Sequence, residues 1–422
     1  MRFRHLHVVQ TFWSAWRPIV TRISASHVVS AALVATLAAT VPTAAQRGGG
    51  GGGGFPLGGP AVSGPPQLDK ITLPPGFSIA IYADGVRGAR SMALGSDGTV
   101  FVGTRAQVVY AVVDRNHDGK ADEVLTVASG LTSPNGVAFK DGSLFVAEVS
   151  RIVRYDGVLD FVKTPGGGTA PPKTVIYDKM PSDFMHGWKY LSFGPDGLLY
   201  TQIGAPGNIL DRGDPYATIV RMKPDGTNFE IFARGVRNSV GQTWHPDTKE
   251  LWFTDNGRDT LGDEQPNDEL NVAPKAGLHF GYPYCHEGTI LDPEFGKGKS
   301  CADYTPPAQR MGPHVAALAL KFYSGSMFPP EYRKQLFIIN HGSWNRSPQV
   351  DFTGFRIMVA KVQGSKVVSY EPFAHGWLQK AAGAEVARQA WGSPVDLLEL
   401  PDGSMLVSDD RAGVIYRIAY RK

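Results

Sequence analysis

Residues 194–204 read GPDGLLYTQIG, a tight turn that runs straight into a strand-like segment. Asp196-Gly197 supplies the positive φ angle that such a turn needs, and apolar and β-branched residues follow it. Looser copies of this unit occur at five other places: GSDGTVFVGT from 95, KDGSLFVAE from 140, HPDTKELWFTD from 245, PPEYRKQLFIIN from 329 and LPDGSMLVSDD from 400. The copies recur roughly every 45 to 85 residues, which is the spacing of β-propeller blades with inserted loops.

Six copies predict an all-β fold, a six-bladed β-propeller that forms a single domain over residues 68–422. The 50 glycines and 31 prolines agree, because they favour turns and short strands over long helices. Only QKAAGAEVARQA at 379–390 is expected to be helical. GFSIAIYA at 76–83 and GVIYRIAY at 413–420 are expected to share the last blade and close the ring, because an open sheet edge invites aggregation.

The first 45 residues have the layout of a secretory signal peptide. Basic residues precede the apolar run VVSAALVATLAATVPTAAQ, which is too short and alanine-rich to favour a permanent membrane span; an uncleaved anchor is the alternative. Residues 46–67 are expected to be a flexible Gly/Pro-rich linker, because no strand precedes their glycine run and no helix follows it to form a dinucleotide site. The mature protein is then periplasmic or secreted, with no membrane span.

Charge and cysteine content narrow the class of protein further. A net charge of +3 gives none of the long-range field that nucleic-acid binding needs, so no nucleic-acid partner is expected. The two cysteines, Cys285 and Cys301, are expected to form a disulfide in an exported protein. Closing a loop of that length contributes about 3 kcal/mol in the chain-entropy model. Two unpaired thiols are the alternative.

The fourth copy of the repeat leads into an unusual loop, DNGRDTLGDEQPNDELN at 255–271. Acids and amides crowd this loop just after an apolar strand, so it is either a solvated turn or a loop that delivers oxygens to a cation. Strand ends of separate blades converge on the central channel of a propeller. We therefore expect Asn256, Gly257 and Arg258 near the channel mouth.

Polar residues also cluster at strand ends in the other copies. They are arginines, amides, histidines and a tryptophan: Arg90, Asn135, His186, Arg237, Asn238, His341, Trp344, Asn345 and Arg346. Such a ring suits an anionic, planar ligand, although His186 could be a structural histidine and Arg237 and Asn238 could simply tie one blade to the next. No HExxH, CxxC, GxSxG or P-loop pattern occurs, so zincin, dithiol, α/β-hydrolase and NTPase chemistry have no support.

Several of these segments carry a resemblance to a known family. MHGWKYLSFGPDGLLY, RGVRNSVG, FTDNGRD with NDELN, HFGYPYCHEG, HGSWNRS and VSDDRAGVIYRI closely resemble the sorbosone dehydrogenase family of pyrroloquinoline quinone (PQQ) dependent sugar dehydrogenases. More distantly they resemble soluble PQQ glucose dehydrogenase. The match runs from about residue 73 to the C-terminus. It implies oxidation of an aldose, a ketose or a sorbosone-like aldehyde by hydride transfer to PQQ, with Ca²⁺ as a second cofactor.

The resemblance also implies roles for individual residues. His186 matches the general base, and Arg237 and Asn238 match the pair that contacts the quinone oxygens, where Arg237 stabilises the developing oxyanion. The backbone carbonyls of Gly257 and Arg258 match the positions that bind the catalytic calcium. Further expected cofactor contacts are Arg90, Asn135, Asn256, His341, Trp344, Asn345 and Arg411. Asp268 and Glu269 are expected to brace the loop or to bind a second calcium.

The chain departs from its relatives at three places. The distant glucose enzymes have acids where this chain has Met185 and Ala205, so another group must orient His186 and the sugar preference cannot be inherited from glucose oxidation. Many relatives have arginine where this chain has Ser393, a loss for which Arg411 is the candidate to compensate. A cysteine pair usual in the GAPGNILD region of the family is absent.

Two alternatives to a dehydrogenase remain open, a calcium-dependent lactonase and a binding propeller without catalysis. No CxxCH haem site occurs, so electrons from a dehydrogenase must pass to a separate acceptor such as a soluble cytochrome or a quinone. Independently of the family, DRNHDGKAD at 114–122 resembles a calcium loop without its closing glutamate; a plain hairpin tip explains it nearly as well.

Overall fold

The computed structural model describes residues 65–421. The predicted signal peptide and most of the predicted linker lie outside these residues. The described part of the chain is nearly all β, with a single short α-helix, α1 (Val158–Lys163), and three 3₁₀ turns, η1 (Leu68–Lys70), η2 (Cys301–Asp303) and η3 (Pro330–Tyr332). No helix within it is long and apolar enough to cross a membrane.

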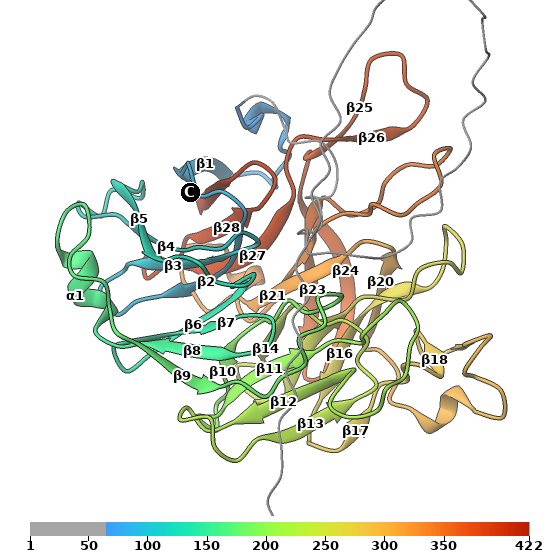
Figure 1. Cartoon of the computed structure of the whole chain (residues 1–422). Coiled ribbons are helices and arrows are strands. Elements are labelled where there is room, and N and C mark those ends of the chain that lie inside the picture. The colour runs from blue at the N-terminus through green and yellow to red at the C-terminus, as the bar shows by residue number, and fades with distance from the viewer. Residues whose placement is uncertain (1–64, 422) are drawn as a thin grey trace, which may run out of the picture. The chain divides into compact units, whose positions relative to one another are not determined.

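Most of the strands form six successive sheets, and Figure 1 labels many of these strands. Blade 1 contains β2 (Ala89–Leu94), β3 (Val100–Thr104), β4 (Val109–Val113) and β5 (Glu123–Ala128). Blade 2 contains β6 (Gly136–Lys140), β7 (Ser143–Ala147), β8 (Ile152–Tyr155) and β9 (Lys173–Tyr177). Blade 3 contains β10 (Ser192–Phe193), β11 (Leu199–Ile203), β12 (Thr218–Met222) and β13 (Glu230–Arg234), extended in parallel by the short β17 (Leu278–His279).

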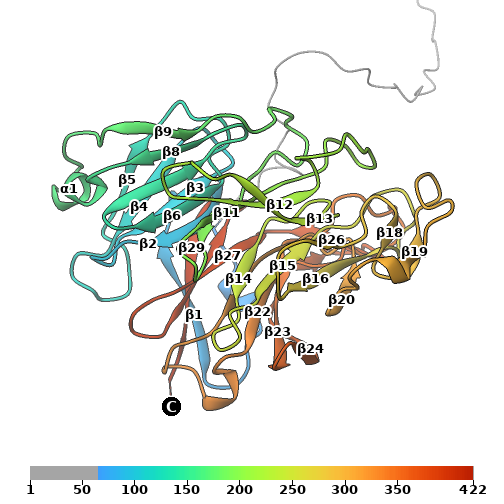
Figure 2. The same cartoon turned by 90° about the horizontal axis from the view of Figure 1, so that it is seen from below.

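The second half of the chain repeats the pattern, which Figure 2 follows in yellow to red. Blade 4 contains β14 (Gln242–Trp244), β15 (Leu251–Asp255), β16 (Asn267–Ala273) and β20 (Gln309–Pro313). Blade 5 contains β21 (Ala317–Phe322), β22 (Leu336–Asn340), β23 (Arg356–Gln363) and β24 (Lys366–His375). Blade 6 contains β27 (Pro394–Glu399), β28 (Met405–Asp409) and β29 (Val414–Tyr420), completed by β1 (Phe77–Ala83).

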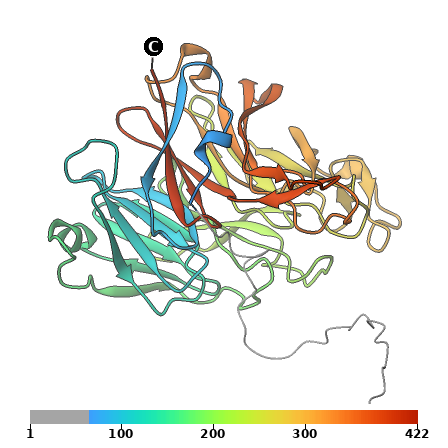
Figure 3. The ribbon, with the colours of Figure 1, turned by 90° about the horizontal axis from the view of Figure 1, so that it is seen from above.

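The last blade closes the ring as predicted. β1 pairs antiparallel with β29, and Phe77 lies opposite Tyr420. Figure 3 shows this first strand, in blue, beside the red C-terminal strands. The two ends of the described chain thus share one sheet, so the six-bladed propeller fold is confirmed.

The repeated unit forms the second strand of every blade: β3, β7, β11, β15, β22 and β28. The repeated unit is not the innermost strand, because β2, β6, β21 and β27 are the strands that contact their counterparts in neighbouring blades at the centre. The tight turns are present as predicted, with Gly197 at a φ of 77°. Where the copy lacks glycine, Lys249 takes the left-handed conformation instead, at a φ of 61°.

A separate hydrophobic cluster fills the space between each pair of adjacent blades. The second strands supply both sides of it by simple alternation: Leu144 and Val146 of β7 face blade 1, whereas Phe145 and Ala147 face blade 3. A strand buried on both faces needs a continuous apolar run. This explains why the repeated unit is the strongest signal in the sequence.

The helix predicted at 379–390 is wrong. The segment forms a two-stranded hairpin, β25 (Leu378–Lys380) and β26 (Ala387–Ala390), with Gly383 at a φ of 77° between them. Arg388 donates to the carbonyls of Ser347 and Val350 at 2.7 and 2.8 Å. These tertiary contacts with a loop outweigh the helix propensity of a short alanine-rich stretch. A further hairpin joins β18 (Cys285–His286) to β19 (Ile290–Leu291).

Candidate active site

One end of the propeller gathers the predicted polar residues. The first two strands of a blade are antiparallel, so the residues before the first strand and after the second lie at the same end. His186 and Arg237 precede the first strands β10 and β14, and Asn256 and His341 follow the second strands β15 and β22. The antiparallel pairing thus brings together residues far apart in the sequence.

His186 is held in one orientation by a backbone carbonyl. Its Nδ1 lies 2.9 Å from the carbonyl oxygen of Ala205, and that oxygen can only accept, so Nδ1 carries the proton and Nε2 keeps a free lone pair. Burial, followed by the charge of Arg237, lowers the pKa of His186 to about 3, so the ring is neutral at pH 7. The residue has a φ of 51°, and a Cβ added at Gly204 would lie 2.5 Å from the His186 Cβ.

Arg237 uses all three nitrogens of its buried guanidinium group on neighbouring loops. Nε donates to the carbonyl of Asn208 at 2.8 Å, Nη2 to Oδ1 of Asn208 at 2.9 Å and Nη1 to the carbonyl of Asn256 at 3.0 Å. The carboxylate of Asp259 lies 3.6 Å away and supplies part of the opposite charge. The carbonyl of Arg237 also accepts from Ala205 N at 2.8 Å, so its backbone ties blade 3 to blade 4.

Asp255 fixes the backbone around Arg237 and Asn238. Its buried carboxyl group accepts from the backbone N–H of Arg237 at 2.8 Å and of Asn238 at 2.6 Å. Asn256 donates from Nδ2 to the carbonyls of Asn238 and Ala317, both at 2.9 Å. The amide side chain of Asn256 thus holds the backbone together, while its carbonyl holds Arg237.

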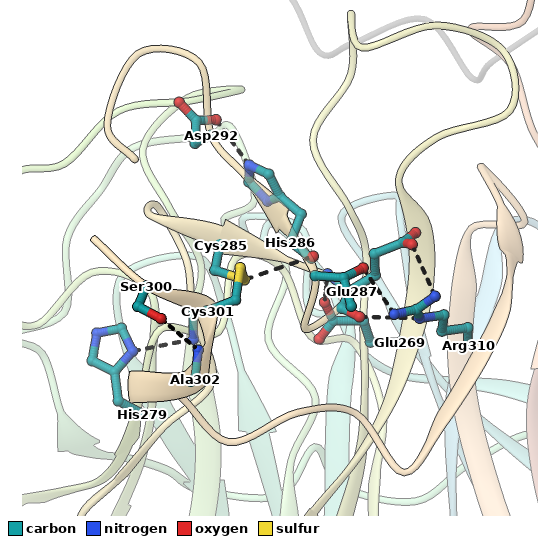
Figure 4. Close-up of a disulfide and its surroundings, with 12 residues drawn as sticks. Glu269, His279, Cys285, His286, Glu287, Asp292, Ser300, Cys301, Ala302 and Arg310 are labelled. Carbon is teal, nitrogen blue, oxygen red and sulfur yellow. Dashed lines mark hydrogen bonds and ion pairs between the residues drawn. A yellow bond between two sulfur atoms is a disulfide. The ribbon is translucent and has the colours of Figure 1, made fainter. Parts of the chain in front are cut away.

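The side chain of Arg258 turns away from Arg237. Its Nη1 donates to Asp292 at 2.5 Å and its Nη2 donates to Glu294 at 3.0 Å. Asp292 also contacts His286 Nε2 at 2.8 Å, and Figure 4 draws Asp292 and His286. Gly257 donates its N–H to Asp268 Oδ1 at 2.8 Å. Within residues 65–421, the carbonyl oxygens of Gly257 and Arg258 accept no hydrogen bond. These oxygens are therefore the groups that this loop has to offer a cation.

Asp268 and Glu269 are consecutive residues of β16, so their side chains point to opposite faces of the sheet. Asp268 braces Gly257, whereas Glu269 accepts from Glu287 N at 2.7 Å and from Asn271 Nδ2 at 3.0 Å. Burial raises the pKa of Asp268 to about 6 and that of Glu269 to about 8. Asp268 thus braces the turn, and a second calcium site on this pair stays a prediction.

Asp410 is the centre of a cluster that the sequence did not reveal. It accepts from Arg90 at 3.0 Å, from Arg105 at 3.2 Å and from His341 Nε2 at 2.9 Å. Burial alone would raise the pKa of Asp410, but the charges of His341 and the two arginines outweigh burial and hold it well below the usual range. Two guanidinium groups around one carboxylate leave a net positive charge.

Trp188 completes this cationic cluster. The guanidinium groups of Arg105 and Arg90 lie 4.3 and 5.1 Å from the centre of its ring. The buried Nη2 of Arg90 and Nε1 of Trp188 have no hydrogen-bond partner among the described residues. Buried donors are normally satisfied, so these two atoms are donors that the described residues leave over. Sequence reasoning missed Trp188, and the one signal that could have found it is its position two residues after His186.

Asn135 and Lys189 form a buried support beneath this cluster. Asn135 accepts from Arg90 Nε at 2.7 Å and donates to the carbonyl of Lys189 at 2.6 Å, so it orients Arg90. Lys189 donates from Nζ to the carbonyl of Gly187 at 2.7 Å, and burial lowers its pKa to about 7. Sequence reasoning missed Lys189.

The segment after β22 lies across the 256–266 loop. Asn345 donates from Nδ2 to Asp259 Oδ1, and Arg346 donates to Glu264 at 2.6 Å. Trp344 is 71% exposed. These contacts make Asn345 and Arg346 anchors of the loop, whereas Trp344 projects into solvent.

Ser393 and Arg411 differ in what they offer the site. Ser393 is buried and donates from Oγ to the carbonyl of His341 at 2.5 Å, so it braces that histidine. Arg411 is half-buried with its guanidinium 5.9 Å from the ring centre of Phe355. Arg105, which the sequence did not single out, brings a guanidinium directly to Asp410.

The predicted disulfide is confirmed. Cys285 and Cys301 are bonded, with a Cα–Cα distance of 5.4 Å, and Figure 4 shows the bond joining the β18 hairpin to η2. Cys285 also lines a small pocket beside Arg237, together with Asp255, Gly257 and Glu269. The disulfide is therefore next to the candidate site.

The loop at 114–122 forms an exposed tip between β4 and β5. Asp114 accepts from the N–H groups of Asp118 and Gly119, at 3.2 and 2.9 Å, and Asp122 accepts from Arg115 N at 2.7 Å. Its carboxylates thus bond to its own backbone. No group of three or more His, Cys, Asp or Glu side chains suited to a metal occurs in the described part of the chain.

Comparison with known proteins gives relatives in sequence. A family model described as glucose/sorbosone dehydrogenase matches residues 167–342. An uncharacterized protein of Borreliella burgdorferi is 31% identical over 363 residues, which cover 83% of this chain and 91% of that protein. An uncharacterized protein of Synechocystis is 26% identical over 175 residues, 35% of this chain and 40% of the other.

Solved structures share the fold. The PQQ domain of pyranose dehydrogenase from Coprinopsis cinerea is 18% identical with a TM-score of 0.67, over 84% of this chain and 98% of the other. The PQQ-bound aldose sugar dehydrogenase of Streptomyces coelicolor is 18% identical with a TM-score of 0.57, over 83% and 100%. Similarity at this level shows the fold alone. The family model and the sequence relative go further: the chain belongs to the glucose/sorbosone dehydrogenase family.

Proposed function

We propose that this protein is an exported quinoprotein that oxidises a sugar with PQQ and Ca²⁺ and passes the electrons to a separate acceptor. Family membership supports an oxidoreductase that acts on sugars. Two proteins with the same fold are described as a PQQ domain and as a PQQ-bound sugar dehydrogenase. The observation that carries the proposal is that His186, Arg237 and the Gly257–Arg258 carbonyls are joined through Ala205 and Asn256 at one end of the propeller.

The residues present fit PQQ, a planar quinone with three carboxylates. Arg90, Arg105 and Arg237 supply positive charge, and Arg90 Nη2 is a buried donor still without a partner among the described residues. Asn238 lies beside Arg237, with its backbone fixed by Asp255. Bound there, PQQ would supply the acceptor for the hydride removed from the sugar.

The 256–258 turn fits a calcium ion. Calcium binds oxygen ligands, backbone carbonyls included, and the carbonyl oxygens of Gly257 and Arg258 accept no hydrogen bond within the described residues. Asp268 holds the Gly257 N–H and Asp292 holds the Arg258 side chain, so the turn is braced on both sides. The ion would supply Lewis-acid polarisation of an oxygen beside it.

His186 is suited to take a proton from a sugar hydroxyl. Its Nε2 lone pair is free because Nδ1 donates to Ala205, and the ring is neutral at pH 7. The distant glucose enzymes have an acid in place of Ala205; here the backbone carbonyl of that residue orients the imidazole. The fixed charge of Arg237 lies close enough to lower the His186 pKa, and the same charge stabilises negative charge that develops nearby.

The test is reconstitution of the purified protein. We expect added PQQ to bind in the presence of Ca²⁺ and not in excess EDTA, and the loaded enzyme to reduce a redox dye when given an aldose, a ketose or an aldehyde sugar. His186→Ala should keep PQQ bound and lose dye reduction by at least about 100-fold, the range for loss of a general base. Acidification of a lactone solution without PQQ would favour the lactonase instead, and no response in either assay would leave a binding propeller.

Export is proposed on two grounds. Residues 1–45 have the layout of a signal peptide, and the Cys285–Cys301 disulfide is typical of an oxidising compartment. N-terminal sequencing of the protein from a periplasmic or culture fraction should find a start after the apolar run. An intact N-terminus in the membrane fraction would contradict cleavage.

A further inference from the structure

The loop between β11 and β12 carries an asparagine with more polar contacts than its neighbours. Asn208 Oδ1 accepts from Arg237 Nη2 at 2.9 Å and from Asp259 N at 2.7 Å. Its Nδ2 donates to the carbonyl of Asp259 at 3.1 Å, and its own carbonyl accepts from Arg237 Nε at 2.8 Å. One side chain therefore joins the guanidinium group of Arg237 to the backbone just after Gly257–Arg258.

Backbone carbonyls hold the other two nitrogens of Arg237, so Nη2 is the one that depends on the Asn208 side chain. Nη1 is held by the Asn256 carbonyl at 3.0 Å, which fixes one corner of the guanidinium plane. The nearest carboxylate, that of Asp259, lies 3.6 Å away, so no close ion pair fixes the other corner. The Asn208 side chain thus adds the third restraint on a buried cation whose donors are directional.

The same residue restrains the 256–260 turn from blade 3. Asp268 holds Gly257 from within blade 4, and Asp292 holds the Arg258 side chain from the disulfide hairpin. Asp259 N and O bond to the Asn208 side chain, which connects this backbone directly to the loop carrying Ala205, the residue whose carbonyl holds His186.

We propose that Asn208 is a positioning residue that couples the orientation of Arg237 to the geometry of the Gly257–Asp259 turn. The expected effect on kcat rests on the proposed function, whereas the expected effect on the structure of the turn does not. The amide suits this role because it accepts at Oδ1 and donates at Nδ2 at once. A carboxylate could keep the first set of bonds and would lose the second.

The first measurement uses the protein without cofactor. Asn208→Ala should speed hydrogen exchange of the amides in peptides that cover 256–262 by about tenfold, because the partly buried N–H of Asp259 loses its acceptor. Leu210→Ala, an exposed side chain two residues further along the same loop, should leave that exchange unchanged. Equal exchange in Asn208→Ala and wild type would overturn the proposal.

The second measurement uses the PQQ- and Ca²⁺-loaded protein. Asn208→Ala should lower kcat by about tenfold or more with a smaller change in KM for the sugar, since Arg237 misorients while the sugar contacts remain. Asn208→Asp keeps the acceptor for both Arg237 Nη2 and Asp259 N, so it should recover most of kcat and return exchange at 256–262 toward the wild-type rate. Recovery of only one readout, or of neither, would contradict the coupling.

The two experiments separate this inference from the proposed function. If wild-type protein binds no PQQ, the proposed function fails, and the exchange rates still decide whether Asn208 holds the turn. If wild type is active and Asn208→Ala retains kcat within twofold, the positioning role fails alone. Far-UV circular dichroism and the Tm of both variants, expected within a few degrees of wild type, show that the propeller remains folded.

Discussion

At the scale of single residues, the chemistry of the site depends on which polar atoms already make hydrogen bonds or ion pairs within the protein. His186 would be an ordinary structural histidine if both ring nitrogens were bonded; because Nδ1 bonds to Ala205, Nε2 keeps an unprotonated lone pair. Arg258 shows the reverse, since its charge is neutralised by Asp292 while its carbonyl accepts no hydrogen bond from the described residues. Residue type alone identified both positions. It could not show that His186 offers its side chain whereas Arg258 offers its backbone carbonyl.

The pH dependence of activity follows from the protonation of His186. With its pKa lowered to about 3, the base stays deprotonated through pH 5 to 8, so kcat/KM should show no acid limb near 6.5 from this group and should fall only toward pH 4. A pH–rate profile of the reconstituted enzyme measures this. An acid limb centred near 6.5 would contradict the buried, Arg237-facing environment of the ring.

Lys189 should make the folded protein more stable as the pH rises. Burial lowers its pKa to about 7, below that of the unfolded chain, so between pH 7 and 10 the unfolded chain holds a proton that the folded protein releases. From pH 7 to 8.5 this contributes about 2 kcal/mol to the free energy of unfolding. Urea unfolding should show that Lys189→Met loses this increment.

The matched control is Lys223→Met. Lys223 is exposed after β12, so this variant should keep the wild-type change in unfolding free energy between pH 7 and 8.5. Identical pH dependence in Lys189→Met and wild type would show that Lys189 keeps its proton in the folded state.

At the scale of elements, the disulfide hairpin acts as a support for the site. The bond between Cys285 and Cys301 closes the segment that carries Asp292, and Asp292 is fully buried against Arg258 and His286. Sequence spacing predicted the disulfide correctly. It could not predict that the loop reaches from β18 to the turn after β15, because that contact depends on how the hairpin folds back.

Removing the carboxyl group of Asp292 should be strongly destabilising. Asp292→Ala leaves the buried Arg258 guanidinium with only the exposed Glu294 as an acidic partner, a loss of about 3 kcal/mol in the free energy of unfolding. Asp303→Ala removes an exposed acid near the same disulfide and should cost less than about 0.5 kcal/mol. Equal losses in the two variants would mean that Arg258 does not depend on Asp292.

The helix predicted at 379–390 was wrong because contacts with a distant loop decide the structure of this segment. Alanine content favours a helix, but the segment is short and its strands gain contacts with the 346–352 loop, including Arg388 to the Val350 carbonyl. The six repeated strands were predictable because their apolar residues face two neighbouring blades. Their place as second strands was not, since alternation looks the same for any strand buried on both faces.

At the scale of the whole molecule, the ring is closed by a strand from the other end of the described chain. Phe77 of β1 packs edge-on against Phe328, Phe373 and Tyr420, with ring centres 4.8 to 5.0 Å apart. Phe328 and Phe373 belong to the neighbouring fifth blade. This strand therefore completes blade 6 and also holds it against blade 5.

Shortening Phe77 should weaken the closure. Phe77→Ala should lower the free energy of unfolding by about 3 kcal/mol, while Ser78→Ala, exposed in the same strand, should change it by less than about 0.5 kcal/mol. Chemical unfolding followed by tryptophan fluorescence measures both. A Phe77→Ala value as small as that of Ser78→Ala would mean that the closing strand adds little to the ring.

The sequence by itself determined the six blades, the strand that closes them, the disulfide and most of the polar positions at the site end. These depend on local patterns, namely turn chemistry, alternation and residues placed next to strands. Only the tertiary structure decided that Ala205 orients His186, that Asp410 gathers Arg90, Arg105 and His341, and that Asn208 holds Arg237. Each of those contacts joins separate blades or loops, and their register depends on the packing of the whole ring, which no local pattern encodes.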